Sequence, residues 1–248
     1  MSGAGDTGDG SAGAGVADGP PKYGETWVYE SIVGAVPGVD LAPRTAVAIQ
    51  LLGFEAALLA LAAAYDLWEA VPAGTAAIAV AGVGSAVMLR MGTLARRAAV
   101  PAPYRHLLFG SSVEVVLSVL AFVALVTYLF VVDPGRGAPA FVERHLGPEP
   151  PAAAAYLTLL IAWDLCYRIG TSWWAAVVGL WRSVRFRFDP ATAATLRKLD
   201  RLNAGFGFVQ LGLLPFVFDR PVLLATLGGH VIAVTVVSAV AFGLVRGE

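Results

Sequence analysis

Six polar side chains of the kind that can carry protons or bind ions stand inside long apolar stretches of this sequence. They are Glu55, Glu114, Asp164, Arg168, Gln210 and His230. A charged group in the hydrocarbon of a bilayer costs at least ~2.5–3.5 kcal/mol on insertion scales, so each one requires a partner or a function. Protonatable groups at one depth are what a proton relay or a cation site needs. The alternative is a static polar network that only fixes how the helices pack.

The six side chains are predicted to form one layer, because the rise of an α-helix places them at similar depths. Counted from the more basic face, Glu55 lies ~16 Å into its apolar stretch, and Glu114 and Gln210 lie ~11 Å into theirs. Counted from the opposite face, Asp164 and His230 lie ~13–17 Å in. We therefore expect a buried layer that extends from the middle of the membrane toward the more basic face.

Asp164 and Arg168 are four residues apart with the acid first, which is the favourable order for an ion pair within one helix. We expect this pair to neutralise itself. Glu55, Glu114 and His230 then remain as the groups that could carry a proton or bind a cation. If the protein were an enzyme, Glu55, Asp164 and His230 would be the first acid–base candidates.

Several familiar cofactor and metal chemistries lack the residues that they need. The only lysines, Lys22 and Lys198, lie outside the apolar stretches, so a retinal Schiff base has no partner. One histidine within those stretches cannot ligate a haem from both sides, and there is no HExxH motif or cysteine pair for zinc. Cys166 stands among apolar neighbours and is expected to be inert. We predict no metal and no cofactor, and the balance is against an enzyme.

The composition shows what must hold these groups in place. Of 248 residues, 57% are hydrophobic and only 14% are charged, with a net charge of −1. A soluble domain normally has about 25% charged residues. The mean hydropathy of +0.71 predicts an integral membrane protein with an all-α, polytopic helix bundle. The small net charge argues against nucleic-acid binding, and the single cysteine excludes a disulfide framework.

Six stretches are long and apolar enough to cross a bilayer, which takes roughly 20 residues. They are Thr45–Leu67, Ala73–Leu89, Leu107–Val132, Ala153–Trp181, Asn203–Phe218 and Val222–Val245. Lys and Arg alternate between the connections: there are four after the second stretch and six after the fourth, against two after the third and one after the fifth. The positive-inside rule therefore predicts a multi-pass protein of the cell membrane with both termini in the cytoplasm.

The chain is predicted to have three parts. Residues 1–22 are mostly Gly, Ala and Asp, and we expect a disordered acidic tail. Residues 23–37 have apolar positions at helical spacing together with Trp27, which favours an amphipathic helix at the membrane interface; a helix docked on the bundle is the alternative. Residues 45–245 form the six-span transmembrane domain.

The connection after the fourth stretch combines arginines with aromatic residues. Arg182, Arg185 and Arg187 are candidates for binding the headgroups of anionic lipids on the cytoplasmic face. The simpler explanation is positive charge that only sets the topology. Asp189 followed by Pro190 predicts the start of a helix that runs to about Leu202.

Three segments of the sequence are similar to segments of other membrane proteins. They are GETWVYESIVGAVPGVDL (Gly24–Leu41), LFGSSVEVVL (Leu108–Leu117) and RIGTSWWAAVVGLWRS (Arg168–Ser183). With the preference for arginine over lysine, the chain from about Tyr23 onward resembles uncharacterised multi-pass membrane proteins of halophilic archaea. The resemblance implies a polytopic membrane protein, and it implies no activity, cofactor or site residue.

The sequence thus favours the handling of a small ion or small solute, linked to protons or cations, through the buried polar layer. The alternative is a membrane scaffold or partner-binding subunit that does not transport. The lipid bilayer is the one partner that the composition requires, and nucleic acid is not expected. A homo-oligomer or a protein partner is left open.

Overall fold

The structure is a computed structural model that describes residues 26–27, 42–136 and 139–247. The predicted tail (1–22) and interfacial helix (23–37) lie outside the described residues, apart from Thr26 and Trp27. Helices make up nearly all of the described chain, and an isolated bridge between Phe188 and Gly247 is the only β-type pairing within it. The predicted all-α fold is confirmed.

Within the described part, five helical stretches are long and apolar enough to cross a membrane, as judged by length and composition. They include α2 (Pro43–Tyr65), α3 (Val71–Arg97), the stretch Ala102–Val132, α7 (Ala152–Arg185) and α10 (Pro221–Leu244). These helices fit an integral membrane protein. They coincide with five of the six stretches that hydropathy selected.

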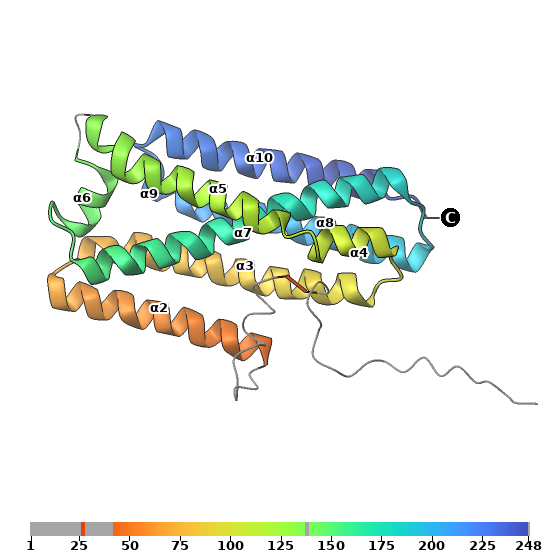
Figure 1. Cartoon of the computed structure of the whole chain (residues 1–248), viewed down its shortest axis with the longest axis horizontal. Coiled ribbons are helices and arrows are strands. Elements are labelled where there is room, and N and C mark those ends of the chain that lie inside the picture. Colours follow the sequence, from red (N-terminus) through yellow and green to blue (C-terminus); the bar gives the residue numbers. More distant parts are fainter. Residues whose placement is uncertain (1–25, 28–41, 137–138, 248) are drawn as a thin grey trace, which may run out of the picture.

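The remaining predicted crossing, Asn203–Phe218, is not a helix of its own. Its residues belong to the second half of α8 (Pro190–Gln210), a 3₁₀ turn η4 (Leu211–Leu213) and the short helix α9 (Leu214–Val217). Because α8 is continuous through Leu202, the charged residues in its middle share one helix with the apolar part and lower its mean hydropathy. The helix nevertheless packs along α10 and α3 within the bundle (Figure 1).

The third predicted crossing is broken, where a single helix had been expected. Helix α4 (Ala102–Phe109) ends at Gly110, and α5 (Val113–Thr127) begins after Ser112 and is followed by a π-helical turn, η2 (Tyr128–Val132). Ser112 has φ of 54°, a left-handed conformation that is uncommon for a residue other than glycine. The Ser111 hydroxyl donates to the Leu107 carbonyl at 2.8 Å and so satisfies one of the free carbonyl groups at the end of α4.

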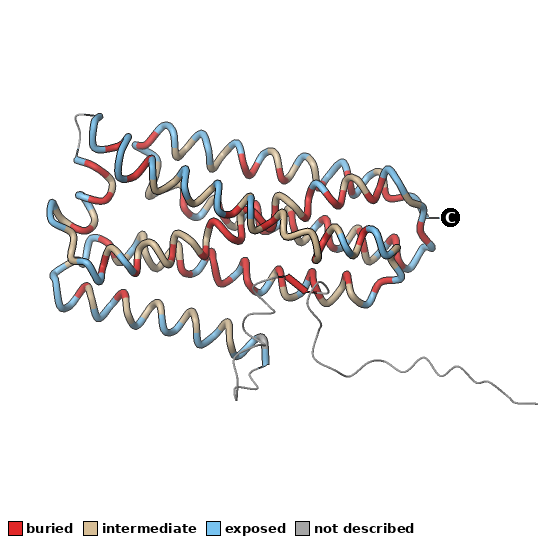
Figure 2. The backbone as a smooth tube through the Cα atoms, in the orientation of Figure 1, coloured by how far each residue is buried: buried red, intermediate tan, exposed pale blue. Residues whose placement is uncertain are grey.

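Helix α7 is the central element of the bundle. It contacts α5, α10, α3 and α8, whereas α2 lies at the edge and packs mainly on α3 (Figure 1). At 1.5 Å per residue α7 is about 51 Å long, well beyond the ~30 Å of bilayer hydrocarbon. Figure 2 shows that buried backbone is concentrated along α7 and the faces of its neighbours. The outer faces of α2, α5 and α10 expose large aliphatic side chains, as expected for helices in lipid.

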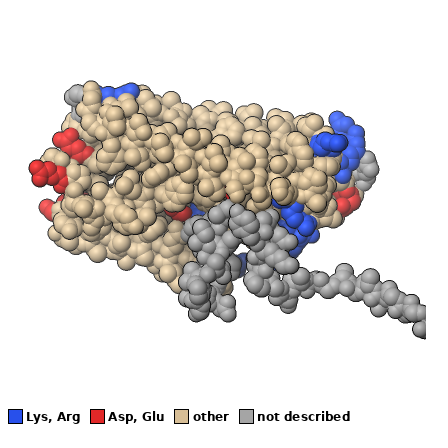
Figure 3. All heavy atoms as spheres, in the orientation of Figure 1, with Lys and Arg blue, Asp and Glu red and all other residues tan. Residues whose placement is uncertain are grey.

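The two ends of the bundle differ in charge. Arg and Lys side chains gather at the end that also holds the α7–α8 connection and the C-terminus, while Asp and Glu predominate at the other end (Figure 3). Exposed members of the basic end include Arg97, Arg185, Arg187, Lys198 and Arg201. Exposed members of the acidic end are Asp66, Glu69, Glu143 and Glu149. We call these the basic end and the acidic end.

Short elements close the acidic end. They are η1 (Trp68–Ala70), η3 (Pro134–Arg136) and α6 (Phe141–Leu146). Val142 and Leu146 of α6 are buried against Tyr128 and Leu129 of η2. Helix α6 therefore covers the end of the bundle with one apolar face.

Candidate functional site

A cavity of about 430 Å³ occupies the half of the bundle nearer the acidic end. Its walls come from α2, α3, α5, α6, α7, α9 and α10, and most of its lining is Leu, Ile, Val, Ala and Phe. Within the described chain, no Asp, Glu, Lys or Arg lines it. The few polar groups in the wall are those of Tyr128, His145, Cys166, Thr158, Thr226 and His230. An apolar cavity with a few polar groups has the usual character of a small-molecule site.

His230 differs from the other polar groups of this wall. Its side chain on α10 is only 8% exposed, and neither ring nitrogen has a hydrogen-bond partner among the described residues. By contrast, Thr158 donates to the Ala154 carbonyl at 2.9 Å, and Nδ1 of His145 lies 2.8 Å from the Phe141 carbonyl. The nearest ring is that of Trp173, with centroids 6.3 Å apart. His230 is therefore the buried lining group with hydrogen-bonding capacity to spare.

A buried ion pair joins the elements that close the acidic end of the bundle beside the cavity. Arg220 Nη1 lies 2.6 Å from Asp133 Oδ1, and both side chains are almost fully buried. Asp133 also accepts from the backbone N–H of Phe141 at 2.6 Å, and Arg220 donates to the Pro139 carbonyl. One carboxylate and one guanidinium thus join η2, the segment that leads into α6, and the start of α10.

A more exposed ion pair lies beside it. Arg144 of α6 and Asp219, which precedes α10, are 2.7 Å apart with side chains 42% and 46% exposed. The hydrogen bond from Arg144 holds the pKa of Asp219 below its ordinary value. This pair ties α6 to the chain between α9 and α10.

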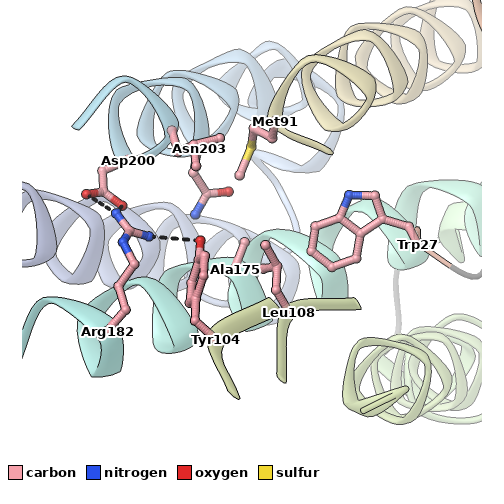
Figure 4. A pocket seen from close by; sticks show the side chains of 9 residues that line it. Trp27, Met91, Tyr104, Leu108, Ala175, Arg182, Asp200 and Asn203 are labelled. Carbon is pink, nitrogen blue, oxygen red and sulfur yellow. Dashed lines mark hydrogen bonds and ion pairs between the residues drawn. The ribbon is translucent and has the colours of Figure 1, made fainter. Parts of the chain in front are cut away.

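The basic end contains a second buried ion pair, between Arg182 of α7 and Asp200 of α8. Arg182 Nη2 reaches both carboxylate oxygens, at 2.8 and 2.7 Å, and also the Leu196 carbonyl at 3.1 Å. The Tyr104 hydroxyl lies 3.3 Å from Arg182 Nη1, and the guanidinium stands over the tyrosine ring (Figure 4). The pocket beside this group has room for about 10 Å³, roughly the space of one water molecule.

Hydrogen bonds extend from this pocket into the bundle. Asn203 of α8 accepts from the Ser172 hydroxyl at 2.9 Å and donates to the Ser172 carbonyl at 3.0 Å. Its amide also contacts the Ser238 hydroxyl of α10 at 3.2 Å. One buried amide therefore joins α7, α8 and α10.

Among the six side chains of the predicted layer, Asp164 and Arg168 form the expected ion pair. Their Oδ1 and Nη2 atoms are 2.7 Å apart, and both side chains are buried. Arg168 also reaches the sulfur of Met88 on α3, at 3.7 Å. The pair therefore faces α3.

Glu114 lies on the opposite side of α7 from that pair. A Cβ atom added to Gly170 would lie 2.7 Å from the Ser118 nitrogen and 2.9 Å from the Glu114 carbonyl oxygen, so Gly170 lets α5 pack against α7 backbone to backbone. Residues 168 and 170 point about 200° apart on a helix. Helix α7 thus presents Gly170 to the backbone of α5 and Arg168 to α3.

Glu114 and Gln210 are fully buried, and their terminal polar atoms have no hydrogen-bond partner among the described residues. Gln210 ends α8, and Glu114 lies in the first turn of α5. Glu55 is only half-buried, and its carboxylate accepts from the Thr75 hydroxyl at 2.7 Å at the α2–α3 contact. Of the six, Asp164 and Arg168 are joined to each other by an ion pair.

The comparison with protein families assigns the chain. A family of unknown function, DUF7530, matches residues 22–241, which is most of the sequence. The chain belongs to DUF7530. No curated protein and no solved structure matches it. The fold and the geometry of this DUF7530 chain must therefore carry the functional argument.

Arg182, which was predicted to bind lipid headgroups, is 1% exposed in this DUF7530 chain and forms an ion pair with Asp200 inside the bundle. Arg185 and Arg187, predicted with it, are exposed at the basic end. The layer prediction placed the polar groups by depth alone, and depth does not fix the side of the helix from which each group projects.

Two ion pairs of this DUF7530 chain were not predicted from its sequence. Asp200 stands among Arg197, Lys198 and Arg201, and an acid in a run of basic residues is the signal that could have indicated a specific partner. Asp133 and Arg220 were assigned to loops, and nothing in their spacing of 87 residues indicates a contact. The described residues contain no group of three or more His, Cys, Asp or Glu that could hold a metal ion.

Proposed function

We propose that this protein is an integral membrane protein that binds a small, uncharged and largely apolar solute in the cavity beside His230. The observation that carries the proposal is the 430 Å³ apolar cavity with one buried imidazole that lacks a hydrogen-bond partner among the described residues. The proposal develops the small-solute alternative of the sequence analysis. Dispersal of the six polar groups makes a shared ion site at that layer less favourable.

The lining selects the chemistry of the solute. A charged solute would lose its hydration on entering a cavity whose walls offer no charged side chain within the described chain, and isolated charges are very costly in such surroundings. An apolar solute from the bilayer gains contacts with the walls and loses no hydration. The site therefore favours molecules that already dissolve in the membrane.

The size of the cavity supports an occupant of some kind. The cavity has a volume of about 430 Å³ and is partly open to the outside of the bundle, so a molecule from the bilayer can enter it. Its walls are mostly apolar, and an apolar occupant gains contacts with them that water does not offer.

His230 requires that the solute carry one polar group that can form a hydrogen bond with the imidazole. A neutral imidazole donates from one nitrogen and accepts at the other. A carbonyl or hydroxyl group on an otherwise apolar molecule satisfies it. Because Tyr128, Thr158 and His145 already have partners, the polar group of the solute is expected at the His230 side of the cavity.

Orientation and surroundings complete the proposal. The gathering of Arg and Lys at one end supports a protein of the cell membrane whose basic end faces the cytoplasm. Exposed Arg185 and Arg187 at that end suit anionic lipid headgroups. The resemblance to membrane proteins of halophilic archaea supports an archaeal source and stays a prediction.

The test is to identify what the purified protein carries. Protein extracted from its membrane in mild detergent is treated with organic solvent, and the extract is analysed by mass spectrometry. We expect an uncharged molecule with a hydroxyl or carbonyl group in stoichiometric amount. His230→Phe should reduce its amount about tenfold, which corresponds to one lost hydrogen bond, and Ala162→Phe should remove it by filling the cavity.

Val177→Phe is the matched control for Ala162→Phe. Val177 is an exposed residue of α7, the helix that carries Ala162, and it does not line the cavity. It should leave the bound molecule unchanged. Recovery of bulk phospholipid alone, in equal amounts from wild type and from His230→Phe, would contradict a specific site.

The second candidate is the non-transporting scaffold. Two buried ion pairs among the described residues favour it, since each joins two elements of the bundle: Arg182–Asp200 and Asp133–Arg220. A protein without a specific bound molecule, unchanged in stability by Ala162→Phe, would support the scaffold.

A further inference from the structure

Glu114 is a buried carboxyl that solute binding does not use. Its side chain is 0% exposed, and both carboxylate oxygens lack a hydrogen-bond partner within the described chain. Glu114 does not line the cavity beside His230. Buried polar atoms without partners are uncommon in folded proteins, so this group needs its own explanation.

Within the described chain, no hydrogen bond or ion pair joins the Glu114 carboxylate to an opposite charge. The element packed most closely on α5 is α7, whose ionisable groups near this level are Asp164, Tyr167 and Arg168. Arg168 is bound to Asp164 and faces α3, and it also lies 5.5 Å from the Tyr167 ring. From η2, the other packed element, Tyr128 is bound to Asp133 near the acidic end. An ionised carboxylate would thus be buried without compensation.

A metal cation does not fit this position. Calcium and magnesium need several oxygen ligands, and the described residues contain no group of three or more His, Cys, Asp or Glu. The Ser118 hydroxyl, one turn along α5, already donates to the Glu114 carbonyl at 2.5 Å. A proton is the one cation that a single carboxyl can bind alone.

The break before α5 places this carboxyl where proton exchange is feasible. Glu114 is the second residue of α5, two residues after the left-handed Ser112. Residues 110–113 are half-buried, whereas Glu114 itself is fully enclosed. Helix α4 leads from the break to the basic end (Figure 1). Interrupted membrane helices commonly mark the positions where charges are handled within the bilayer.

We propose that Glu114 is a proton-binding site whose carboxyl is protonated in the folded protein and exchanges its proton with the basic end through the break at Gly110–Ser112. The site is independent of the cavity and of its solute. Uptake neutralises the carboxyl for burial against α7, and release requires the break to admit water. The protonation of Glu114 therefore follows the pH at the basic end of the bundle.

Infrared spectroscopy of the full chain in liposomes tests the protonation directly. A protonated carboxyl in apolar surroundings gives a distinct carbonyl-stretch band. We expect this band at pH 7 in wild type, its loss in Glu114→Gln, and its retention in Glu55→Gln. Glu55 is a matched control because it is half-buried and hydrogen-bonded to Thr75. Absence of the band from wild type, or its persistence in Glu114→Gln, overturns the proposal.

Deuterium oxide tests the exchange. The band should shift within minutes of transfer to deuterated buffer, and a band that does not shift over hours overturns exchange through the break. His230→Phe should leave both the band and its shift unchanged, so failure of solute binding and failure of the proton site are distinguishable. Thermal unfolding of Glu114→Gln, compared with wild type, verifies that the variant is folded.

A carbodiimide that dissolves in the membrane gives a second readout. The protonated carboxyl gives its proton to a carbodiimide nitrogen, and its oxygen bonds to the central carbon. The acyl group then migrates to nitrogen, so the whole reagent is added and nothing leaves. Peptide mass spectrometry should find the adduct on Glu114. Faster labelling of Glu55 than of Glu114 at pH 7 would overturn the assignment.

Discussion

The two halves of this bundle are built differently. Toward the basic end, Arg182 binds Asp200 and Tyr104, Asn203 joins three helices nearby, and the pocket between these groups has room for about 10 Å³. Toward the acidic end, aliphatic walls surround a cavity of about 430 Å³. Hydrogen bonds are directional and hold helices at fixed spacing, whereas aliphatic contacts tolerate an inserted molecule. The difference indicates a rigid half that holds the helices and an adaptable half that binds.

The adaptable half is still fastened at its outer end. Asp133 and Arg220 lie at the boundary of the bundle and join η2 to α10. The cavity therefore lies between two ion-paired layers, with the Asp164–Arg168 pair and the Arg182–Asp200 pair on its inner side. Variants that break the ion pair at one end only test whether the two halves of the bundle unfold independently.

The largest effect is expected at the basic end. Arg182→Met leaves Asp200 buried without its partner, which should reduce the free energy of unfolding by about 3–5 kcal/mol. Denaturant unfolding in detergent measures it. The double variant Arg182→Met/Asp200→Leu should recover most of the loss, because an apolar pair needs no compensation. Arg185→Met, at an exposed position, should change stability by less than ~0.5 kcal/mol.

A smaller effect is expected at the acidic end. Asp133→Asn removes a charge-assisted hydrogen bond and should cost about 1.5–3 kcal/mol. Hydrogen exchange should accelerate in Phe141–Leu146 and not around Asn203. Equal acceleration in both halves would show that the two ends do not unfold separately, and the comparison would fail.

The contact between α5 and α7 should be sensitive to a single methyl group. In Gly170→Ala, the added Cβ meets the backbone of α5, so the helices must separate at a cost of about 1–3 kcal/mol. Gly53→Ala is the control, since nothing lies within 4 Å of its added methyl, and it should stabilise α2 by about 0.5–1 kcal/mol. Thermal unfolding of both variants gives the comparison.

The smallest effects come from exposed carboxylates, one at each end. Hydrogen bonding from Thr192 holds the pKa of Asp189 below its ordinary value, and Arg144 does the same for Asp219. Because both are lowered on folding, their stabilising contribution is full above the ordinary Asp value near ~3.9 and is lost as pH falls through the folded-state pKa. Unfolding midpoints measured between pH 6 and 3 should fall less in Asp189→Asn than in wild type.

Much of the local structure could be predicted from the sequence. Five of the six apolar stretches became membrane-length helices, and the pairing of Asp164 with Arg168 followed from their spacing. Asp189 caps α8 as predicted, since its carboxylate accepts from the N–H groups of Ala191 and Thr192 at 3.0 Å. These features depend on neighbours within four residues. The functional residues, by contrast, remain predictions and proposals.

The errors have a common cause. Helix α8 was predicted to end near Leu202 because its charge pattern changes there, yet it continues to Gln210 through contacts with α3 and α10. The break before α5 was missed because hydropathy averages over Gly110–Ser112. Depth along a helix follows from residue number, but the face on which a residue lies depends on how the helix is rotated in the bundle.

The sequence by itself determined that this chain is helical, apolar along most of its length, and charged differently at its two ends. Hydropathy and helical spacing are sums over neighbouring residues, so no partner from elsewhere in the chain is needed to read them. Only the tertiary structure decided that Arg182 meets Asp200, that α5 packs closely on α7 at Gly170, and that His230 lines a cavity. These depend on the rotation of each packed helix, which is set by many weak contacts between residues distant in sequence.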